Sequence, residues 1–511
     1  MDLQHTHARN PEDALRGYRW YRTLDAWAGM LLCAAVVIAP WILGTSSAAA
    51  TWVLNIIGYA NGFVLLAKHA LRRKGMYFPP RWGEDVVAAG MSEPGYRPLA
   101  LAARWMTRCM FVGTVLVLCY TAVSALNWRA STATGVLAYH DKFIPWLPHS
   151  YAADLTWGAF WRNLALACHF WGMRDWLLGM SLRESGVYRR VSRPIPSMPQ
   201  VLPERLTWLL WALCLNGTLL ALVSILQQQT RTPRLLWFLE PSYGGPDFHF
   251  GPFNYRGNAA QFFNLLWPVT LAFWWARQRP LSEIRRAGGL WGTQPHMVLL
   301  PCLLVEVACP VISSSHGGAV VATMLAIVAL ALFALVNRSE TAKNRLAMLA
   351  PFALGVFLAM GLGWTHATRG FLDSFADDLG DRAEIHENAR KMASEFEWFG
   401  SGPGTFRALY ALYRGNADQD WANYAHNDWL EFRITYGWLG FAVLLVLLLL
   451  PFVRWWCQEG IKLRLDFVGL VWLAMLGCLL HAMYDFPFQI YSIRILFLTL
   501  CAVCFCSARG D

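Results

Sequence analysis

Long apolar stretches, separated by shorter polar segments, extend through most of the 511-residue chain. A bilayer-spanning helix needs about 20 consecutive, mostly apolar residues, whereas the strands of a membrane barrel alternate polar and apolar positions. Because the apolar stretches here are continuous, the pattern predicts an all-α, polytopic helical membrane protein with about twelve transmembrane helices. The predicted spans lie near residues 24–44, 50–67, 100–126, 154–180, 205–227, 259–276, 296–312, 317–336, 346–365, 436–453, 465–481 and 487–508.

The composition supports a bilayer as the solvent of this chain. Hydrophobic residues make up 56% of the sequence and charged residues only 15%, against about 25% charged residues in an average soluble protein. Many polar residues precede the first apolar stretch and a second span follows it at once, so we expect an uncleaved first helix rather than a signal peptide. The twelve cysteines lie in or beside predicted spans, which indicates neither a disulfide framework nor a metal cluster.

The distribution of basic residues predicts the orientation in the membrane. The formal net charge is +10, and most Lys and Arg residues fall in the N-terminal tail and in alternate loops such as "KHALRRKG" and "RESGVYRRVSR". This is the positive-inside pattern, which places both termini in the cytoplasm. The basic residues form no single patch, so the excess of positive charge does not indicate nucleic-acid binding.

Four segments follow from the predicted spans. Residues 1–240 hold transmembrane helices 1–5, residues 241–365 hold helices 6–9, residues 366–435 form a loop domain, and residues 436–511 hold helices 10–12. In the loop domain, Ile385, Ala389, Met392 and Phe396 recur at helical spacing, and Asp381 is a plausible N-cap for that helix. The stretch "FGSGPGTF" then ends the pattern, and a second short helix in "RALYALYR" is expected. The loop domain should therefore be folded and helical.

His426 is the first candidate for chemistry. It lies in "YAHNDWLEF", shortly before the span at 436–453, and Asn427 and Asp428 follow it directly. An imidazole can accept a proton from an attacking hydroxyl near neutral pH, and neighbouring polar groups can orient it. A purely structural role for His426 is the alternative.

Arg256 and Arg382 are candidates for binding phosphate. Arg256 lies at the start of the span 259–276 and Arg382 at the start of the amphipathic helix. A guanidinium is planar, always charged and able to form two parallel hydrogen bonds with phosphate oxygens. Alternatively, Arg256 extends to lipid headgroups and Arg382 is a solvated charge.

Other polar positions have a structural and a functional interpretation. Gly402 and Gly404 form either a tight turn or a nest of backbone N–H groups that contacts substrate, and Ser315 and His316 either cap a helix or contribute to a site. His481 and Asp485 form a hydrogen-bonded turn or contribute to the same site. Arg162 and the Arg174–Asp175 pair, inside spans, either line a cavity or pair with other side chains. Asp377 and Asp378 are more typical of a solvated loop than of a metal site.

The second half of the chain resembles the O-antigen ligase and O-antigen polymerase (Wzy-type) family. The resemblance rests on "DRAEIHENARKM", then "WFGSGPGTF", then "YAHNDWLEFRITYGWLGF", in this order, and covers roughly residues 240–450. The sequence departs from the family pattern at "GDR", where Ser/Thr-Gly-Arg is usual, and at "SSSHGG", where His316 stands at a position that is often arginine.

The resemblance implies a GT-C-like glycosyltransferase of the bacterial inner membrane, with its active site at the periplasmic face. In such an enzyme Arg256 and Arg382 would bind the diphosphate of an undecaprenyl-diphosphate-linked glycan. His426 would activate or position an acceptor hydroxyl, and His316, Asn427, Gly402 and Gly404 are further possible substrate-binding residues. The reaction would invert the anomeric carbon and need no metal or other cofactor. The acceptor would be a glycan or the lipid A core, and nucleic acid is not an expected partner.

A transporter or flippase of lipid-linked sugars is the alternative from another class. Such a protein would be expected to show inverted repeats and charges deep in the membrane. We find no internal repeat in the sequence, and the candidate residues fall in loops predicted to lie on one face. These features favour an enzyme.

Overall fold

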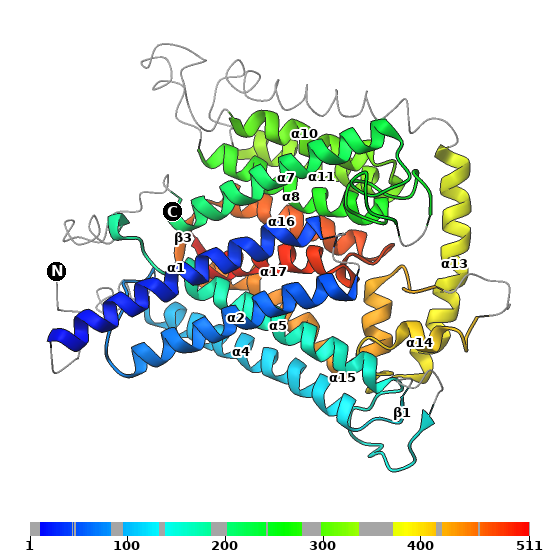
Figure 1. Ribbon diagram of the computed structural model, residues 1–511, viewed down its shortest axis with the longest axis horizontal. Helices are drawn as coiled ribbons and strands as arrows, with labels where there is room; N and C mark the ends of the chain where they lie inside the picture. Colours follow the sequence, from blue (N-terminus) through cyan, green and yellow to red (C-terminus); the bar gives the residue numbers. More distant parts are fainter. Residues whose placement is uncertain are drawn as a thin grey trace.

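The computed structural model describes residues 11–42, 44, 47–82, 96–131, 138–184, 202–241, 244–277, 298–336, 371–414, 422–457 and 460–509. Helices cross the molecule lengthwise (Figure 1). They are α1 (Pro11–Trp41), α2 (Ala48–Arg73), α4 (Tyr96–Leu126), α5 (Ala153–Leu177), α7 (Glu204–Thr230), α8 (Arg256–Ala276), α10 (Leu299–Ile312), α11 (His316–Val336), α15 (Asp428–Arg454), α16 (Leu465–His481) and α17 (Tyr491–Cys506).

The predicted all-α membrane fold is confirmed. Among the described residues, six helices are long and apolar enough to cross a membrane, and α10, α16 and α17 are shorter apolar helices. Every predicted span except one falls on a helix of the structure; the exception, 346–365, lies outside the described residues. The chain is therefore a multi-pass membrane protein.

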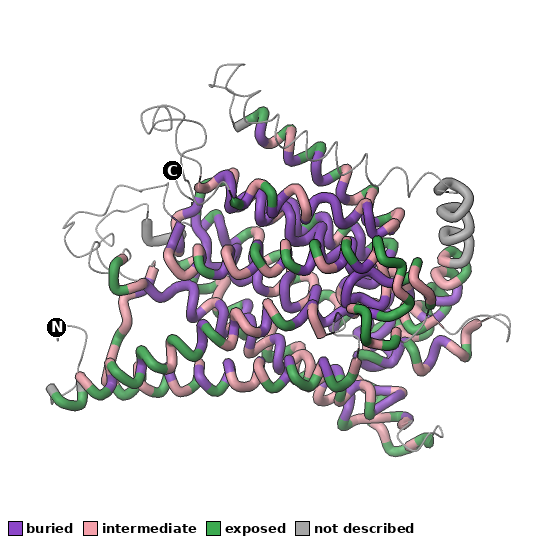
Figure 2. The backbone as a smooth tube through the Cα atoms, turned by 45° about the horizontal axis from the view of Figure 1, so that its top comes forward, coloured by how far each residue is buried: buried purple, intermediate pink, exposed green. Residues whose placement is uncertain are grey.

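The helices pack in two groups. In the first, α5 contacts α2, α4 and α17, and α15 packs on α4; in the second, α8 contacts α7, α10, α11 and α16. Contacts of α1 and α17 with members of both groups join the two halves. Helix α8 is buried from Gly257 to Trp275, and buried residues fill the middle of the bundle (Figure 2). A central, covered helix thus carries Arg256 at its first position.

The helix α13 (Phe371–Glu395) and several shorter elements lie at the two ends of the bundle. One end carries α13, α14 (Phe406–Tyr410) and the antiparallel pair β1 (Ala130–Ser131) and β2 (Ala138–Tyr139), with Ala130 opposite Tyr139. Near the opposite end, η4 (Trp455–Cys457) precedes β3 (Ile461–Leu463), which pairs in parallel with β4 (Ser507–Arg509). The 3-10 turn η5 (Pro487–Gln489) joins α16 to α17. We call the first of these the loop-domain end, because the described part of the loop domain lies there (Figure 1).

The loop domain has its own small core. Ala389 and Met392 of α13 are fully buried against residues of α14, while Ile385 and Phe396 pack at the edge of this cluster. The predicted helical stripe is therefore confirmed. The expected N-cap is wrong, because α13 begins at Phe371 and Asp381 lies inside the helix. The sequence "FADDLGD" tolerates helix despite its glycine and acids, since an isolated Gly costs only about 1 kcal/mol.

A glycine kink fastens the loop domain to α15. Gly437 has φ +61° and ψ −175° within α15, so the helix is divided at this residue. The chain on both sides of the kink runs beside residues 397–402: Ser401 N donates to Ile434 O at 2.9 Å before the kink, and Trp438 N donates to Glu397 O at 2.8 Å after it. Tyr120 of α4 donates to the carbonyl oxygens of Phe399 and Tyr436. The first turns of α15 consequently belong to the loop domain and the remainder to the bundle.

At the opposite end, buried ion pairs tie helices together. Asp175 of α5 accepts hydrogen bonds from Arg72 at 2.6 Å and Arg81 at 2.8 Å, and its other oxygen lies 2.7 Å from Lys68 Nζ. Lys68 also lies 2.7 Å from Asp25 of α1. Lys68 is fully buried and Asp175 nearly so, which means that each charge needs its partner. The Arg174–Asp175 pair singled out in the sequence thus includes a structural anchor.

We predict that Asp175→Asn destabilises the protein by about 3–5 kcal/mol, because it leaves buried cations without their counter-charge. The midpoint of thermal unfolding in detergent should fall clearly. Glu387→Gln is the control, since it removes only the exposed Glu387–Lys391 pair, a class worth about 0.3–0.5 kcal/mol. Equal midpoints for the two variants would contradict the proposed anchor.

We also predict that Gly437→Ala destabilises the junction of loop domain and bundle. The backbone conformation of Gly437 costs other residues about 1–3 kcal/mol, and an added Cβ would lie 2.3 Å from Trp398 O. The expected readout is faster proteolysis of the loop domain and lower yield. Gly469→Ala in α16 is the matched control, because no atom lies within 4 Å of the Cβ that it adds. A Gly437→Ala protein as resistant as this control would show that the kink is not required.

Candidate functional site

Polar side chains from distant parts of the chain meet at the loop-domain end of the bundle. We call Tyr255, Arg382, His426, His481 and Asp485 the Asp485 cluster. They come from the residue before α8, from α13, from the segment before α15, and from the end of α16 with the hairpin after it. Two predicted site residues, Arg382 and His426, are therefore members of one cluster.

Asp485 lies at the centre of the cluster. It is 4% exposed, and its backbone N donates to His481 O at 3.0 Å, which continues the hydrogen-bond pattern of α16 by one turn. Its Oδ1 lies 3.3 Å from His426 Nδ1, and its Oδ2 lies 3.4 Å from His481 Nε2. Oδ1 also accepts a hydrogen bond from Phe486 N at 3.0 Å. One carboxylate thus lies between two imidazoles.

The electrostatic surroundings keep Asp485 ionised. Burial by itself would raise the pKa of this carboxyl group, but His426, His481 and Arg382 outweigh burial and hold the pKa well below its usual range. A buried carboxylate that stays charged can in turn stabilise a protonated imidazole beside it. Asp485 is therefore suited to orient His426.

Arg382 reaches from α13 across the hairpin. Its Nη1 donates to Tyr484 O at 2.6 Å, and its Nη2 donates to the Tyr255 hydroxyl at 3.1 Å. Tyr255 directly precedes Arg256, so this contact connects the loop domain to the start of α8. The guanidinium is partly exposed and therefore remains within reach of a ligand.

Arg256 stands beside the cluster. Its Nη1 donates to Asp247 O at 3.1 Å, in the loop before α8. The next residue, Gly257, lies so close to Asp485 that a Cβ on it would be 2.9 Å from Asp485 Oδ2. The structure thus places the start of α8 against the cluster, with the guanidinium of Arg256 directed at the neighbouring loop. The absence of a side chain at position 257 is what permits this approach.

The backbone holds His426 in an uncommon conformation. Its φ is +49°, in the left-handed region that non-glycine residues seldom adopt. His386 of α13 lies 3.1 Å from His426 O through Nε2, and because a carbonyl only accepts, Nε2 carries the proton. Burial lowers the pKa of His386, so His386 is neutral near pH 7. A strained residue fixed from both sides is typical of a functional position.

Aromatic rings wall the cluster. The Phe486 ring stacks on Tyr424 at 4.4 Å and on Tyr255 at 5.6 Å, and the His426 imidazole meets it edge-on at 4.8 Å. These rings exclude water from one side of His426, which strengthens the interactions of the charged groups.

The remaining predicted residues lie in nearby structural elements. Asn427 is the N-cap of α15, and its Oδ1 accepts from Leu430 N at 3.0 Å. His316 opens α11 next to Gly317, where a Cβ would lie 3.4 Å from His481 Cε1. Ser315 caps α11 by accepting a hydrogen bond from Gly318 N at 3.2 Å. His316 thus begins a helix that borders the cluster, and Asn427 has a defined structural contact.

Gly402 and Gly404 lie in the turn predicted at "FGSGPGTF". Both have positive φ, at +106° and +83°, and Gly402 N donates to Thr435 O at 3.1 Å. A Cβ on Gly402 would lie 2.7 Å from Ser150 Oγ. The turn therefore packs between the segment before α5 and the first turns of α15.

Several members of the site give little signal in the sequence. His386 reads as one more polar residue of an amphipathic helix, and Tyr255, Tyr484 and Phe486 read as aromatic residues at a membrane boundary. The available signal is the clustering of His481 and Asp485 one helical turn apart at the end of a span, since intramembrane ionisable residues are often functional. Only the fold shows that this pair faces His426.

Residues 301–445 match the family model described as O-antigen ligase. This match confirms the predicted resemblance to the O-antigen ligase and polymerase family, and with it the general type of activity, a membrane glycosyltransferase acting on lipid-linked glycans. No curated protein matches the chain. The matched residues include α10, α11, α13 and the first part of α15, and they hold Arg382 and His426 but not Asp485.

Proposed function

We propose that this chain, which carries an O-antigen ligase domain, moves a glycan from an undecaprenyl-diphosphate carrier to an acceptor hydroxyl at the periplasmic face. The observation that supports the proposal best is the meeting of Arg382, His426 and the start of α8 around the buried Asp485. Cations suited to a diphosphate and a base suited to a hydroxyl thereby lie at one end of a membrane bundle.

The two arginines would bind the donor. Arg382 is partly exposed and already positioned by Tyr484 and Tyr255, so a diphosphate would meet a guanidinium whose orientation is fixed. Arg256 would turn from Asp247 O, an exposed contact, to the phosphate oxygens. Charge that develops on the departing diphosphate would then be neutralised by groups already in place.

His426 would accept the proton of the acceptor. Its Nδ1 faces Asp485, so Nε2 is the nitrogen left for the substrate. The acceptor oxygen attacks the anomeric carbon, and its proton passes to Nε2. The bond from the anomeric carbon to the diphosphate oxygen breaks, its electron pair stays on the diphosphate, and the configuration at the carbon inverts. His426 is the catalytic residue in this scheme, and Asp485 is a positioning residue.

The reaction is either ligation to the lipid A core or polymerisation of glycan units. Both use the same donor site and differ only in the acceptor. Cleavage of the bond to the diphosphate supplies the driving force, so the proposed reaction uses neither a metal nor a nucleotide.

We predict that His426→Ala and Arg382→Ala each lower glycan transfer by a factor of about 100 or more, the range expected for loss of a general base or of transition-state electrostatics. The assay is transfer from a synthetic polyprenyl-diphosphate glycan by purified protein, read by mass spectrometry. Arg390→Gln, an exposed cation on the same helix as Arg382, is the control and should retain activity. Unchanged transfer by the two alanine variants would refute the assignment.

A separate prediction concerns Asp485. Asp485→Asn keeps the size of the side chain but removes the carboxylate that faces His426 Nδ1. The imidazole is then less well oriented toward the acceptor hydroxyl, so kcat should fall while KM for the donor stays near that of the parent. A folded variant with the kcat of the parent, or with kcat and KM altered together, would show that Asp485 has only a structural role.

A further inference from the structure

A cavity lies between α4, α5, α15 and α17. Its volume is about 280 Å³, near the lower end of the ~300–1,000 Å³ typical of ligand pockets. Phe488 and Gln489 of η5 line it, but none of the five members of the Asp485 cluster does. The hairpin after α16 therefore separates two different sites.

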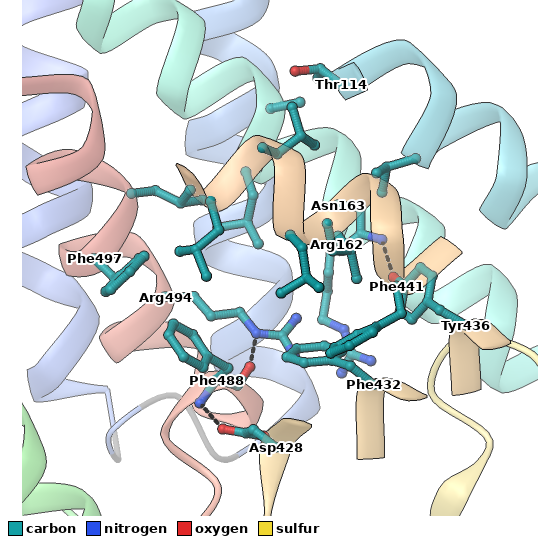
Figure 3. Close-up of a pocket in the computed structure, with 18 of the residues that line it drawn as sticks. Thr114, Arg162, Asn163, Asp428, Phe432, Tyr436, Phe441, Phe488, Arg494 and Phe497 are labelled. Atoms are coloured by element: carbon teal, nitrogen blue, oxygen red, sulfur yellow. Dashed lines mark hydrogen bonds between the residues drawn. The ribbon is translucent and has the colours of Figure 1, made fainter. Parts of the chain in front are cut away.

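Two arginines enter this cavity from opposite helices. Arg162 reaches in from α5 and Arg494 from α17, and Figure 3 shows both side chains extending toward the same region. Arg494 donates to Phe488 O through Nε and to Gln489 Oε1 through Nη2 at 3.0 Å. Among the described residues, the Nε of Arg162 is inaccessible to solvent and has no hydrogen-bond partner, whereas the side chain as a whole is half-buried and lines the cavity. An unpaired buried N–H group is costly, and a ligand in the cavity could bind the same guanidinium.

The carboxylates of Asp428 and Glu431 also line this cavity and interact electrostatically with Arg494, but neither forms an ion pair with it. Asp428 accepts hydrogen bonds from Phe488 N at 2.7 Å and Gln489 Nε2 at 2.9 Å, and Glu431 accepts one from Ala425 N at 2.9 Å. Among the described residues, no carboxylate forms an ion pair with Arg162 or Arg494. The two guanidiniums instead repel each other electrostatically. An anion placed between them would remove this repulsion.

Most of the remaining lining of the cavity is apolar, although Asn163, Asp428, Glu431 and Thr435 also line it. The apolar walls include Leu118, Phe170, Leu444, Leu448 and Phe497. The helix α5 begins at Ala153, at the loop-domain end, and Arg162 lies roughly 13 Å along it, because each residue of a helix adds ~1.5 Å. The two arginines thus lie toward the loop-domain end of the cavity, and the hydrocarbon side chains extend from there into the bundle. A cavity with a polar end and apolar walls is complementary to a lipid whose headgroup lies at the boundary of the membrane.

We propose that this cavity binds a membrane lipid, with an anionic phosphate group between Arg162 and Arg494 and a hydrocarbon chain along α4, α15 and α17. The lipid is either a phospholipid or a polyprenyl phosphate, because both combine a phosphate with a long apolar chain. This site differs from the donor site proposed above, since it uses other arginines on other helices.

The test is native mass spectrometry of the purified protein after incubation with phosphatidylglycerol or, in a second arm, with a polyprenyl phosphate. Arg162→Gln and Arg494→Gln should each weaken retention of the lipid roughly tenfold, as expected for loss of one charged hydrogen-bonding group. Arg162→Lys should retain part of the binding. Arg129→Gln is the matched control and should behave like the parent protein, because the exposed Arg129 packs on the rings of Phe143 and Tyr151, outside the cavity.

A further variant tests the apolar part. Ala167→Phe narrows the cavity without changing a charge, and it should reduce lipid retention while leaving the thermal midpoint near that of the parent. The arm that retains lipid identifies the source of the phosphate. Lipid retention by the parent equal to that of the arginine variants, or no retained lipid in either arm, would overturn the proposal.

Binding here does not depend on glycosyl transfer. His426→Ala is expected to lose transfer and keep the lipid, whereas Arg162→Gln is expected to lose the lipid. Failure of the proposed reaction and failure of the lipid site can therefore be told apart in the same set of proteins. Lipid loss in His426→Ala as large as in Arg162→Gln would contradict a separate site.

Discussion

Burial of one ionised carboxylate organises the loop-domain end of this protein. Asp485 is almost inaccessible to water, and a charge in such a place is tolerated only where cations and hydrogen-bond donors surround it. His426, His481 and Arg382 supply that surrounding, and they come from three separate segments. The same requirement that stabilises Asp485 therefore brings the candidate base and a candidate phosphate-binding arginine together. The contacts that stabilise the buried charge are thus the same contacts that position the site residues.

Much of the fold was predictable because a bilayer imposes a simple rule on sequence. A continuous apolar stretch of sufficient length must be a helix, since its backbone polar groups have no water to bind. The site was predictable only in part. His426 and Arg382 stand out by residue type and neighbours, but the contact of Arg382 with Tyr255 joins residues 127 positions apart, and no local pattern encodes it. The predicted start of α13 was wrong because a local pattern was misleading. The stretch "FADDLGD" has the acids and the glycine typical of a helix boundary, yet the helix continues through it.

The loop domain keeps its place through backbone contacts rather than through a large interface. Gly437 divides α15, and the chain on both sides of this kink forms backbone hydrogen bonds with residues 397–402. One residue, Asn427, lies between His426 and α15 and caps that helix. The His426 imidazole is consequently positioned by the same backbone that fixes the kink. A catalytic group held this way depends on the fit of the backbone, since small displacements of reacting groups reduce rates strongly.

The hairpin that follows α16 is held from both sides by carboxylates of different character. Asp485, inside the hairpin, faces the imidazoles of His426 and His481, whereas Asp428, at the start of α15, accepts hydrogen bonds from Phe488 N and the Gln489 side chain. Asp428 N in turn donates to Ala482 O at 2.9 Å, so the hairpin and the start of α15 are bonded at both ends of the turn. This mutual bracing keeps Phe486 packed on the cluster side and Phe488 on the cavity side. The hairpin therefore separates the Asp485 cluster from the cavity, because hydrogen bonds and packing hold it on both sides.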